Sequence, residues 1–116
     1  AAPAVVAASV PLAQHALNDA QTANSIEATL RAKIIHTRLL IQRGALDEAL
    51  DEGHEVIASA RKVGTRRLIG EGLAVTSEAH AKRGERPQAV ALWDEAKRTL
   101  TPLHHPLSHI TPDWLL

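Results

Sequence analysis

The stretch LLIQRGALDEALDEG at residues 39–53 returns forty residues later in a related form, AHAKRGERPQAVALW at residues 79–93. Each copy has a glycine, Gly44 or Gly84, followed five residues later by an alanine. Glycine ends helices readily because it adopts the left-handed backbone conformation, and the flanking segments have the apolar spacing of helices. The sequence therefore predicts the same helix–turn–helix unit twice, at a fixed period that is typical of stacked helical-repeat proteins.

Helical patterns cover most of the remaining chain. Ser25 and Thr65 are candidate N-caps, Gly64 is a third helix stop, and no segment has the alternating pattern of a strand. The sequence thus predicts an all-α fold after a lead-in at residues 1–9. Five helices are expected, at about residues 10–23, 25–43, 46–63, 65–83 and 87–100.

The composition is that of a single small globular domain. The chain has 116 residues, of which 45% are hydrophobic, and its formal net charge is zero. A chain of balanced charge does not fit direct nucleic-acid binding, and no apolar run is long enough to span a membrane. The absence of cysteine excludes disulfides and thiolate zinc sites. We expect a cytoplasmic protein and, because the chain starts without methionine, a fragment of a longer one.

The last segment, residues 101–116, differs from the helices before it. Pro102, Pro106 and Pro112 interrupt it, yet it is strongly apolar. Such a segment either folds back over the last helix pair, where it caps the open end of a helical array, or packs against another chain. The residues expected at that cap or interface are Leu107, Ile110, Trp114 and Leu115.

Paired helices with a glycine between them and small residues at fixed positions resemble the tetratricopeptide repeat. The first helix of that repeat has a small residue near its middle, and here Thr37 and Ser77 stand at that position. The second helix has an alanine, which matches Ala49 and Ala89. Small side chains at both positions let the two helices of one repeat approach closely.

The resemblance also has departures. Trp93 matches the large aromatic residue of the family's second helix, and we expect it to be a core residue. The first copy has Gly53 at that position. The period of forty residues exceeds the family's usual period of about 34. Long repeats of this kind are similar to those in the C-terminal sensor regions of bacterial transcription regulators.

The resemblance implies antiparallel helix pairs over residues 10–100, that is, a fragment of an α-solenoid. It implies a protein- or peptide-binding scaffold without a cofactor, as the regulatory or sensor portion of a larger transcription regulator. In this family the first helices line a concave groove. The matching positions here are Arg31, Ile34, Arg38, Ile41, Gln42, Glu71, Ala74, Glu78 and Lys82. Two alternatives are a module that forms a homodimer through the tail or the first helix, and a small-molecule sensor domain.

Charged residues forty apart have opposite signs in three cases, namely Glu27 with Arg67, Arg31 with Glu71, and Arg38 with Glu78. Equivalent first helices lie side by side in the family, so we expect these residues to pair between neighbouring repeats. Each exposed pair would contribute only about 0–1 kcal/mol. The alternative is that the same residues contact a ligand in the groove.

Seven histidines raise the question of a metal site. His104, His105 and His109 lie in the tail, but their spacing matches no zinc motif. The other four are scattered, and none maps to another histidine at the forty-residue period. The chain also has no glycine-rich phosphate loop, no nucleophile elbow and no HExxH motif. We therefore expect neither a metal site nor enzymatic activity.

Overall fold

The computed structural model describes the backbone of residues 11–116 and the side chains of Thr22 and residues 24–116. Over this part of the chain the protein is all-α. Its helices are α2 (Pro11–Arg43), α3 (Leu46–Val63), α4 (Arg66–Lys82) and α5 (Arg86–Leu100). Three short 3-10 helices follow, η1 (Thr101–Leu103), η2 (Pro106–His109) and η3 (Asp113–Leu115). The lead-in expected at residues 1–9 lies outside the described residues.

The expected break between the first two helices is wrong, because residues 11–43 form the single helix α2. Ser25 lies inside this helix, and its carbonyl accepts a hydrogen bond of 2.7 Å from the Thr29 hydroxyl. The segment from residue 12 to residue 43 contains no glycine or proline that would interrupt the helix. The bounds expected for the three later helices agree with the structure to within one residue.

Gly44 and Gly84 make the same turn at positions forty residues apart. Their φ angles are 81° and 82°. In both turns the residue after the glycine donates its N–H to the carbonyl five residues back at 2.9 Å, and the glycine donates to the carbonyl three residues back at 3.0 Å. This is the Schellman pattern. Gly64 instead donates one bond of 2.9 Å to the Ala60 carbonyl. Two kinds of turn therefore alternate, one inside each predicted unit and the other between the units.

The small residues named above are all completely buried. Thr37, Ser77, Ala49 and Ala89 each have 0% exposure. Larger apolar side chains surround them in two clusters. The first cluster joins α2, α3 and α4, and its largest members are Leu30, Ile34, Leu40, Ile41, Leu50 and Leu68. The second joins α3, α4 and α5 with the tail, and it includes Ile57, Leu73 and Trp93. Trp93 is thus a core residue, as its position in the pattern predicts.

Gly53 is required where the resemblance expects an aromatic residue. A Cβ atom built on Gly53 would overlap the Thr76 hydroxyl and would lie 3.2 Å from the Thr76 Cβ. Thr76 is itself fully buried and donates a hydrogen bond of 2.7 Å to the Gly72 carbonyl. Helices α3 and α4 therefore approach too closely at this point for any side chain at position 53.

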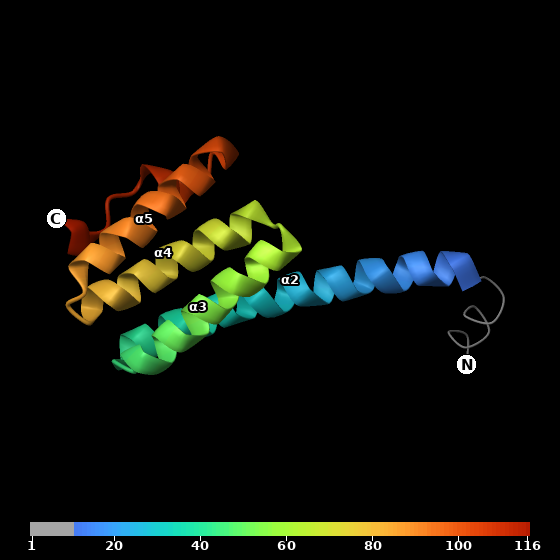
Figure 1. Ribbon diagram of the computed structural model, residues 1–116, viewed down its shortest axis with the longest axis horizontal. Coiled ribbons are helices and arrows are strands. Elements are labelled where there is room, and N and C mark those ends of the chain that lie inside the picture. Colours follow the sequence, from blue (N-terminus) through green and yellow to red (C-terminus); the bar gives the residue numbers. More distant parts are fainter. Residues whose placement is uncertain (1–10) are drawn as a thin grey trace.

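The helices lie side by side in chain order, and the N-terminal part of α2 extends beyond the others (Figure 1). Helix α4 is central, because it packs against α2, α3 and α5 and also contacts η3. The tail runs back along α5, so that the C-terminus lies near the turn between α4 and α5 (Figure 1). Within the described residues, no helix combines the length and apolar character that a membrane crossing needs.

We predict that Gly53→Ala destabilises the protein by about 1–2 kcal/mol. The added methyl group overpacks the α3–α4 contact, which costs about 1–3 kcal/mol, while the better helix propensity of alanine returns at most about 1 kcal/mol. Urea unfolding followed by circular dichroism measures the change. In a Thr76→Ala background the same substitution should cost clearly less, since the overlapping hydroxyl is gone. Equal costs in both backgrounds would show that this contact does not restrict position 53.

Candidate functional site

A pocket of about 280 Å³ lies where the tail crosses α4 and α5. It is called the tail pocket here. Its lining comes from three helices and the tail, namely Arg38, Ala74, Val75, Glu78, Lys82, Trp93, Leu107, Ile110, Pro112, Asp113 and Trp114. Four of the predicted groove residues and three of the predicted tail residues are among them. The structure thus brings two sets of residues, predicted separately, to one place.

The remaining predicted groove residues lie elsewhere. Ile34 and Ile41 are 5% and 4% exposed and belong to the hydrophobic core, so neither can contact a ligand unless the core opens. Arg31 and Gln42 are exposed on α2, outside the tail pocket. Glu71 contacts the tail at a different point, where one of its oxygens lies 3.7 Å from the His105 Nε2 atom. Five of the nine predicted groove residues therefore lie outside the tail pocket.

A local network at His105 positions the start of η2. The His105 Nδ1 atom accepts a hydrogen bond of 3.1 Å from the Leu107 N–H, which caps the 3-10 helix. The His105 carbonyl accepts two more bonds, from the N–H of the buried Ser108 at 3.0 Å and from its hydroxyl at 2.7 Å. His104, just before, has a positive φ of 53°, an uncommon conformation for a residue other than glycine. These contacts turn the chain back toward α4.

The end of the tail is held by Trp93 and Arg86. The rings of Trp93 and Trp114 meet edge to face, with centroids 6.4 Å apart and an interplanar angle of 83°. The two terminal nitrogens of the Arg86 guanidinium donate to the carbonyls of Trp114 and Leu115, each at 2.9 Å. Leu115 packs beside Trp93 in the second cluster. Sequence analysis missed Arg86, because nothing in its position indicates a role until the tail has folded back.

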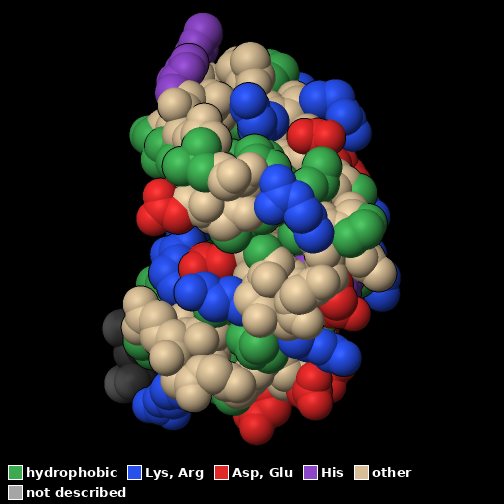
Figure 2. All heavy atoms as spheres, turned by 90° about the vertical axis from the view of Figure 1, so that its left-hand side faces the viewer, with side chains coloured by type: hydrophobic (Ala, Val, Ile, Leu, Met, Phe, Trp, Pro, Cys, Tyr) green, Lys and Arg blue, Asp and Glu red, His purple; other side chains and the backbone are tan. Residues whose placement is uncertain are grey.

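Four charged residues line the tail pocket without forming ion pairs. None of Arg38, Glu78, Lys82 and Asp113 has an opposite charge within 4 Å among the described side chains. Over the surface that faces the reader in Figure 2, positive and negative side chains alternate with hydrophobic ones, and neither sign dominates. The pocket therefore combines an apolar aromatic wall with free charges of both signs.

The three charge pairs predicted between neighbouring repeats are not formed. Glu27 pairs instead with Arg31 at 3.9 Å, and Arg67 pairs with Glu71 at 3.7 Å, in both cases along one helix. Residues four apart on a helix lie on the same face, so they reach one another more easily than residues on the next helix. Arg38 and Glu78 both reach the tail pocket but lie farther than 4 Å apart.

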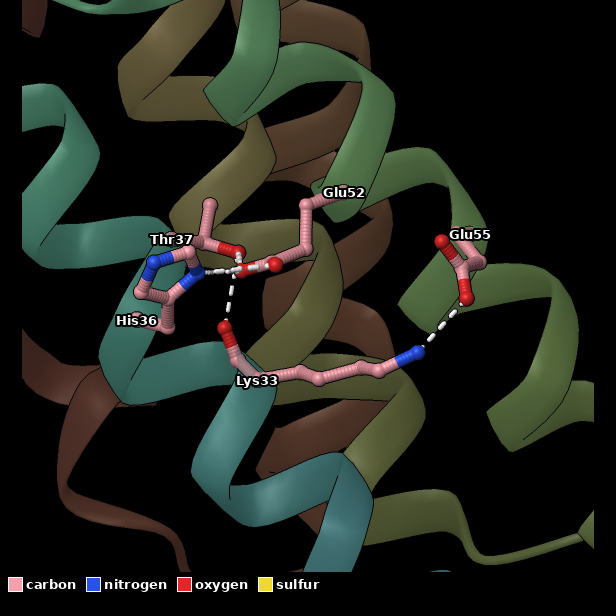
Figure 3. Close-up of polar contacts among 5 residues, drawn as sticks. All are labelled: Lys33, His36, Thr37, Glu52 and Glu55. Atoms are coloured by element: carbon pink, nitrogen blue, oxygen red, sulfur yellow. Dashed lines mark hydrogen bonds and ion pairs between the residues drawn. The ribbon is translucent and has the colours of Figure 1, made fainter.

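A second polar cluster fastens α2 to α3 (Figure 3). The Glu52 carboxylate contacts the His36 Nδ1 atom at 2.8 Å and accepts a hydrogen bond of 2.8 Å from the Thr37 hydroxyl. Nearby, the Lys33 ammonium donates to Glu55 at 2.6 Å, and this bond raises the pKa of Lys33. Because Thr37 is completely buried, its hydroxyl cannot reach a substrate. The cluster therefore connects the two helices.

A third cluster joins two histidines, His54 and His80. They are not forty residues apart in the sequence, so the forty-residue period does not relate them. The Nε2 atoms of His54 on α3 and His80 on α4 are 3.1 Å apart. The Glu85 carboxylate lies 3.0 Å from the His80 Nδ1 atom, which assigns the hydrogen of neutral His80 to that nitrogen. His54 then donates its Nε2–H to His80. Among the described side chains, no three potential ligands are grouped so that they could hold a metal ion.

A larger and more open hollow of about 650 Å³ lies between α2 and α3, away from the predicted groove. It is called the α2–α3 hollow here. Most of its lining side chains are hydroxyls or apolar groups, namely Thr22, Ser25, Ile26, Thr29, Leu30 and Ser59, and Lys33 completes it. Among its described lining residues Lys33 alone is charged, and it is already bonded to Glu55. The hollow is larger than the tail pocket, but fewer kinds of chemical group converge in it.

Comparisons with protein-family models, with curated proteins and with solved structures find no match to this chain.

We predict that His54 makes the protein less stable as the pH falls through about 6.5. Burial, and secondly the neighbouring His80, lower the pKa of His54 below its ordinary value of 6.5, while Asp51 opposes the change. Below 6.5 the unfolded chain gains a proton at this position before the folded chain does, so the unfolded state is favoured. The stability advantage of the wild type over His54→Gln should shrink between about pH 7.5 and pH 5. Urea titrations at each pH measure it, and a constant difference would contradict the prediction.

Proposed function

We propose that this protein is a peptide-binding helical scaffold built from repeats of the tetratricopeptide kind. Three features support the repeat. Matching turns lie at Gly44 and Gly84, a different turn lies between them, and the small residues of both units are completely buried. Helical-repeat proteins use the concave surface of the array to bind other chains.

The observation that carries the proposal is the tail pocket. A volume of about 280 Å³ is sufficient for one or two side chains and is small for a cofactor or a drug-sized ligand. Apolar surface from Trp93, Leu107 and Ile110 can receive an apolar side chain. Arg38 and Lys82, which come from two different helices, can bind carboxylates or carbonyls of the same peptide, because neither forms an ion pair within 4 Å among the described residues.

The position of such a scaffold in a larger protein follows from the resemblance described above. We propose that it is the regulatory or sensor portion of a bacterial transcription regulator that acts in the cytoplasm. In that role the scaffold would bind a peptide or a protein, and the DNA contact would be made elsewhere. The balanced charge of the chain agrees with this division of roles.

One observation favours an oligomerisation module as the second candidate. Two large apolar side chains one turn apart on α2 are exposed, with Ile35 at 59% and Leu39 at 44% exposure. Apolar groups repeated along one helix face are typical of helix–helix contacts between chains. A small-molecule sensor is the third candidate, and the α2–α3 hollow is the space that it would use.

We predict that the double variant Arg38→Ala, Lys82→Ala binds peptides more weakly than the wild type by roughly tenfold or more, since each substitution removes a charge-assisted hydrogen bond. The probes are peptides selected on the wild-type chain from a random displayed library, and fluorescence anisotropy measures the affinity. Arg43→Ala, Lys62→Ala is the matched control, because it removes two exposed cations outside the tail pocket. Equal losses in both variants, or a library that yields no binder, would contradict a peptide site in this pocket.

A further inference from the structure

The tail already binds the helices in the way that a peptide would. Arg86 contacts the carbonyls of Trp114 and Leu115, which are main-chain atoms present in any peptide. Recognition of main-chain carbonyls provides affinity for a segment, while a pocket for a side chain provides specificity. The side chain in this case is Trp114, whose ring meets Trp93 edge to face. Residues 113–115 therefore form a short peptide motif, Asp-Trp-Leu, seated on α4 and α5.

This attachment is shallow. Trp114 and Leu115 are half-buried, Ile110 is 48% exposed and Leu116 is 89% exposed. Among the described residues, the two bonds from Arg86 are the only hydrogen bonds between residues 110–116 and the α-helices. The secondary structure of this segment is a single 3-10 helix of three residues. The segment is therefore held by few contacts with the α-helices.

The charges of the tail pocket indicate which residues a peptide would need in order to bind more tightly than the tail does. With the tail in place, Arg38 and Lys82 are balanced by Glu78 and by Asp113 of the tail itself. If the tail leaves, Asp113 leaves with it, and two cations face one carboxylate. The open pocket then favours a peptide with acidic residues beside its aromatic residue, and additional carboxylates can reach Arg38 and Lys82.

We propose that the segment Pro112–Leu116 is an intrachain ligand of the recognition surface, and that the partner is a linear peptide from another protein with the same pattern. This peptide has one or more acidic residues followed by an aromatic residue and leucine, and it binds by displacing the tail. The proposal rests on the peptide-binding function proposed above. A tethered segment competes at a high effective concentration, so the apparent affinity of the partner is lowered by the small fraction of chains whose surface is open.

The experiment uses the full chain and a labelled peptide with the sequence of residues 109–116, HITPDWLL. We expect the peptide to bind Trp114→Ala at least about tenfold more tightly than the wild type, because the weakened tail no longer competes. Leu116→Ala is the matched control and should behave as the wild type, since Leu116 is almost fully exposed. Adding Arg86→Ala to the Trp114→Ala chain should remove the gain, and a peptide with alanine in place of its tryptophan should not bind.

A measurement on the wild-type chain makes the test independent of how the variants fold. The chain has two tryptophans, so an isotope-labelled sample gives two indole N–H signals in a nuclear magnetic resonance spectrum. Unlabelled peptide should move the Trp114 signal toward that of a solvent-exposed indole. If that signal stays in place and Trp114→Ala binds the peptide no better than the wild type, the inference is wrong. A wild-type chain that forms a dimer by exchanging tails would also overturn it, because the occupant would then be a second copy.

Failure of this inference can be told apart from failure of the proposed function. If the peptides selected from a library bind and lose affinity in Arg38→Ala, Lys82→Ala, but the tail peptide does not bind, the scaffold function stands and the tail is only a cap. If neither kind of peptide binds any variant, the proposed function itself fails.

Discussion

The close approach of the helices at completely buried small residues is the constraint on which the rest of this structure depends. The chain has no phenylalanine, tyrosine or methionine, so its core must be filled mainly by aliphatic side chains and by helix backbones that come near one another. Thr37, Ser77, Ala49 and Ala89 provide that approach in both units. Gly53 shows how strict it is, because even a methyl group there would overlap Thr76.

The two units have side chains of very different size at the same position of the pattern, and the candidate site lies beside the larger one. At the same place in the pattern the first unit has Gly53, against which α4 packs directly, while the second has Trp93. In the described chain α5 is followed by the short 3-10 helices of the tail, and the tail packs against the cluster that contains Trp93. The edge-to-face contact with Trp114 is the result. The tail pocket exists because a large side chain at the end of the helix array is covered by a short segment in place of a helix.

Charged residues form ion pairs along single helices in two of the predicted positions. Glu27 pairs with Arg31 and Arg67 pairs with Glu71, whereas Glu78 and Lys82, which are also four residues apart on one helix, form no ion pair. Arg38 and Glu78 face space that the tail only partly fills, and they remain free of ion pairs among the described residues. Charges without ion pairs thus lie beside an aromatic wall, near the Arg86 guanidinium that holds the carbonyls of Trp114 and Leu115.

The sequence by itself determined the all-α class, the three later helices, the glycine turns and the core position of Trp93, because helix periodicity and helix stops are local properties of the chain. It also indicated that the tail packs on something and that Arg38, Ala74, Glu78 and Lys82 share a surface. Only the tertiary structure decided that α2 is continuous, that Ile34 and Ile41 are core residues, and that His54 meets His80. It also decided that Arg86 holds the tail. These outcomes depend on which helix faces meet and how closely, and a one-dimensional pattern does not contain the distances between segments far apart in the chain.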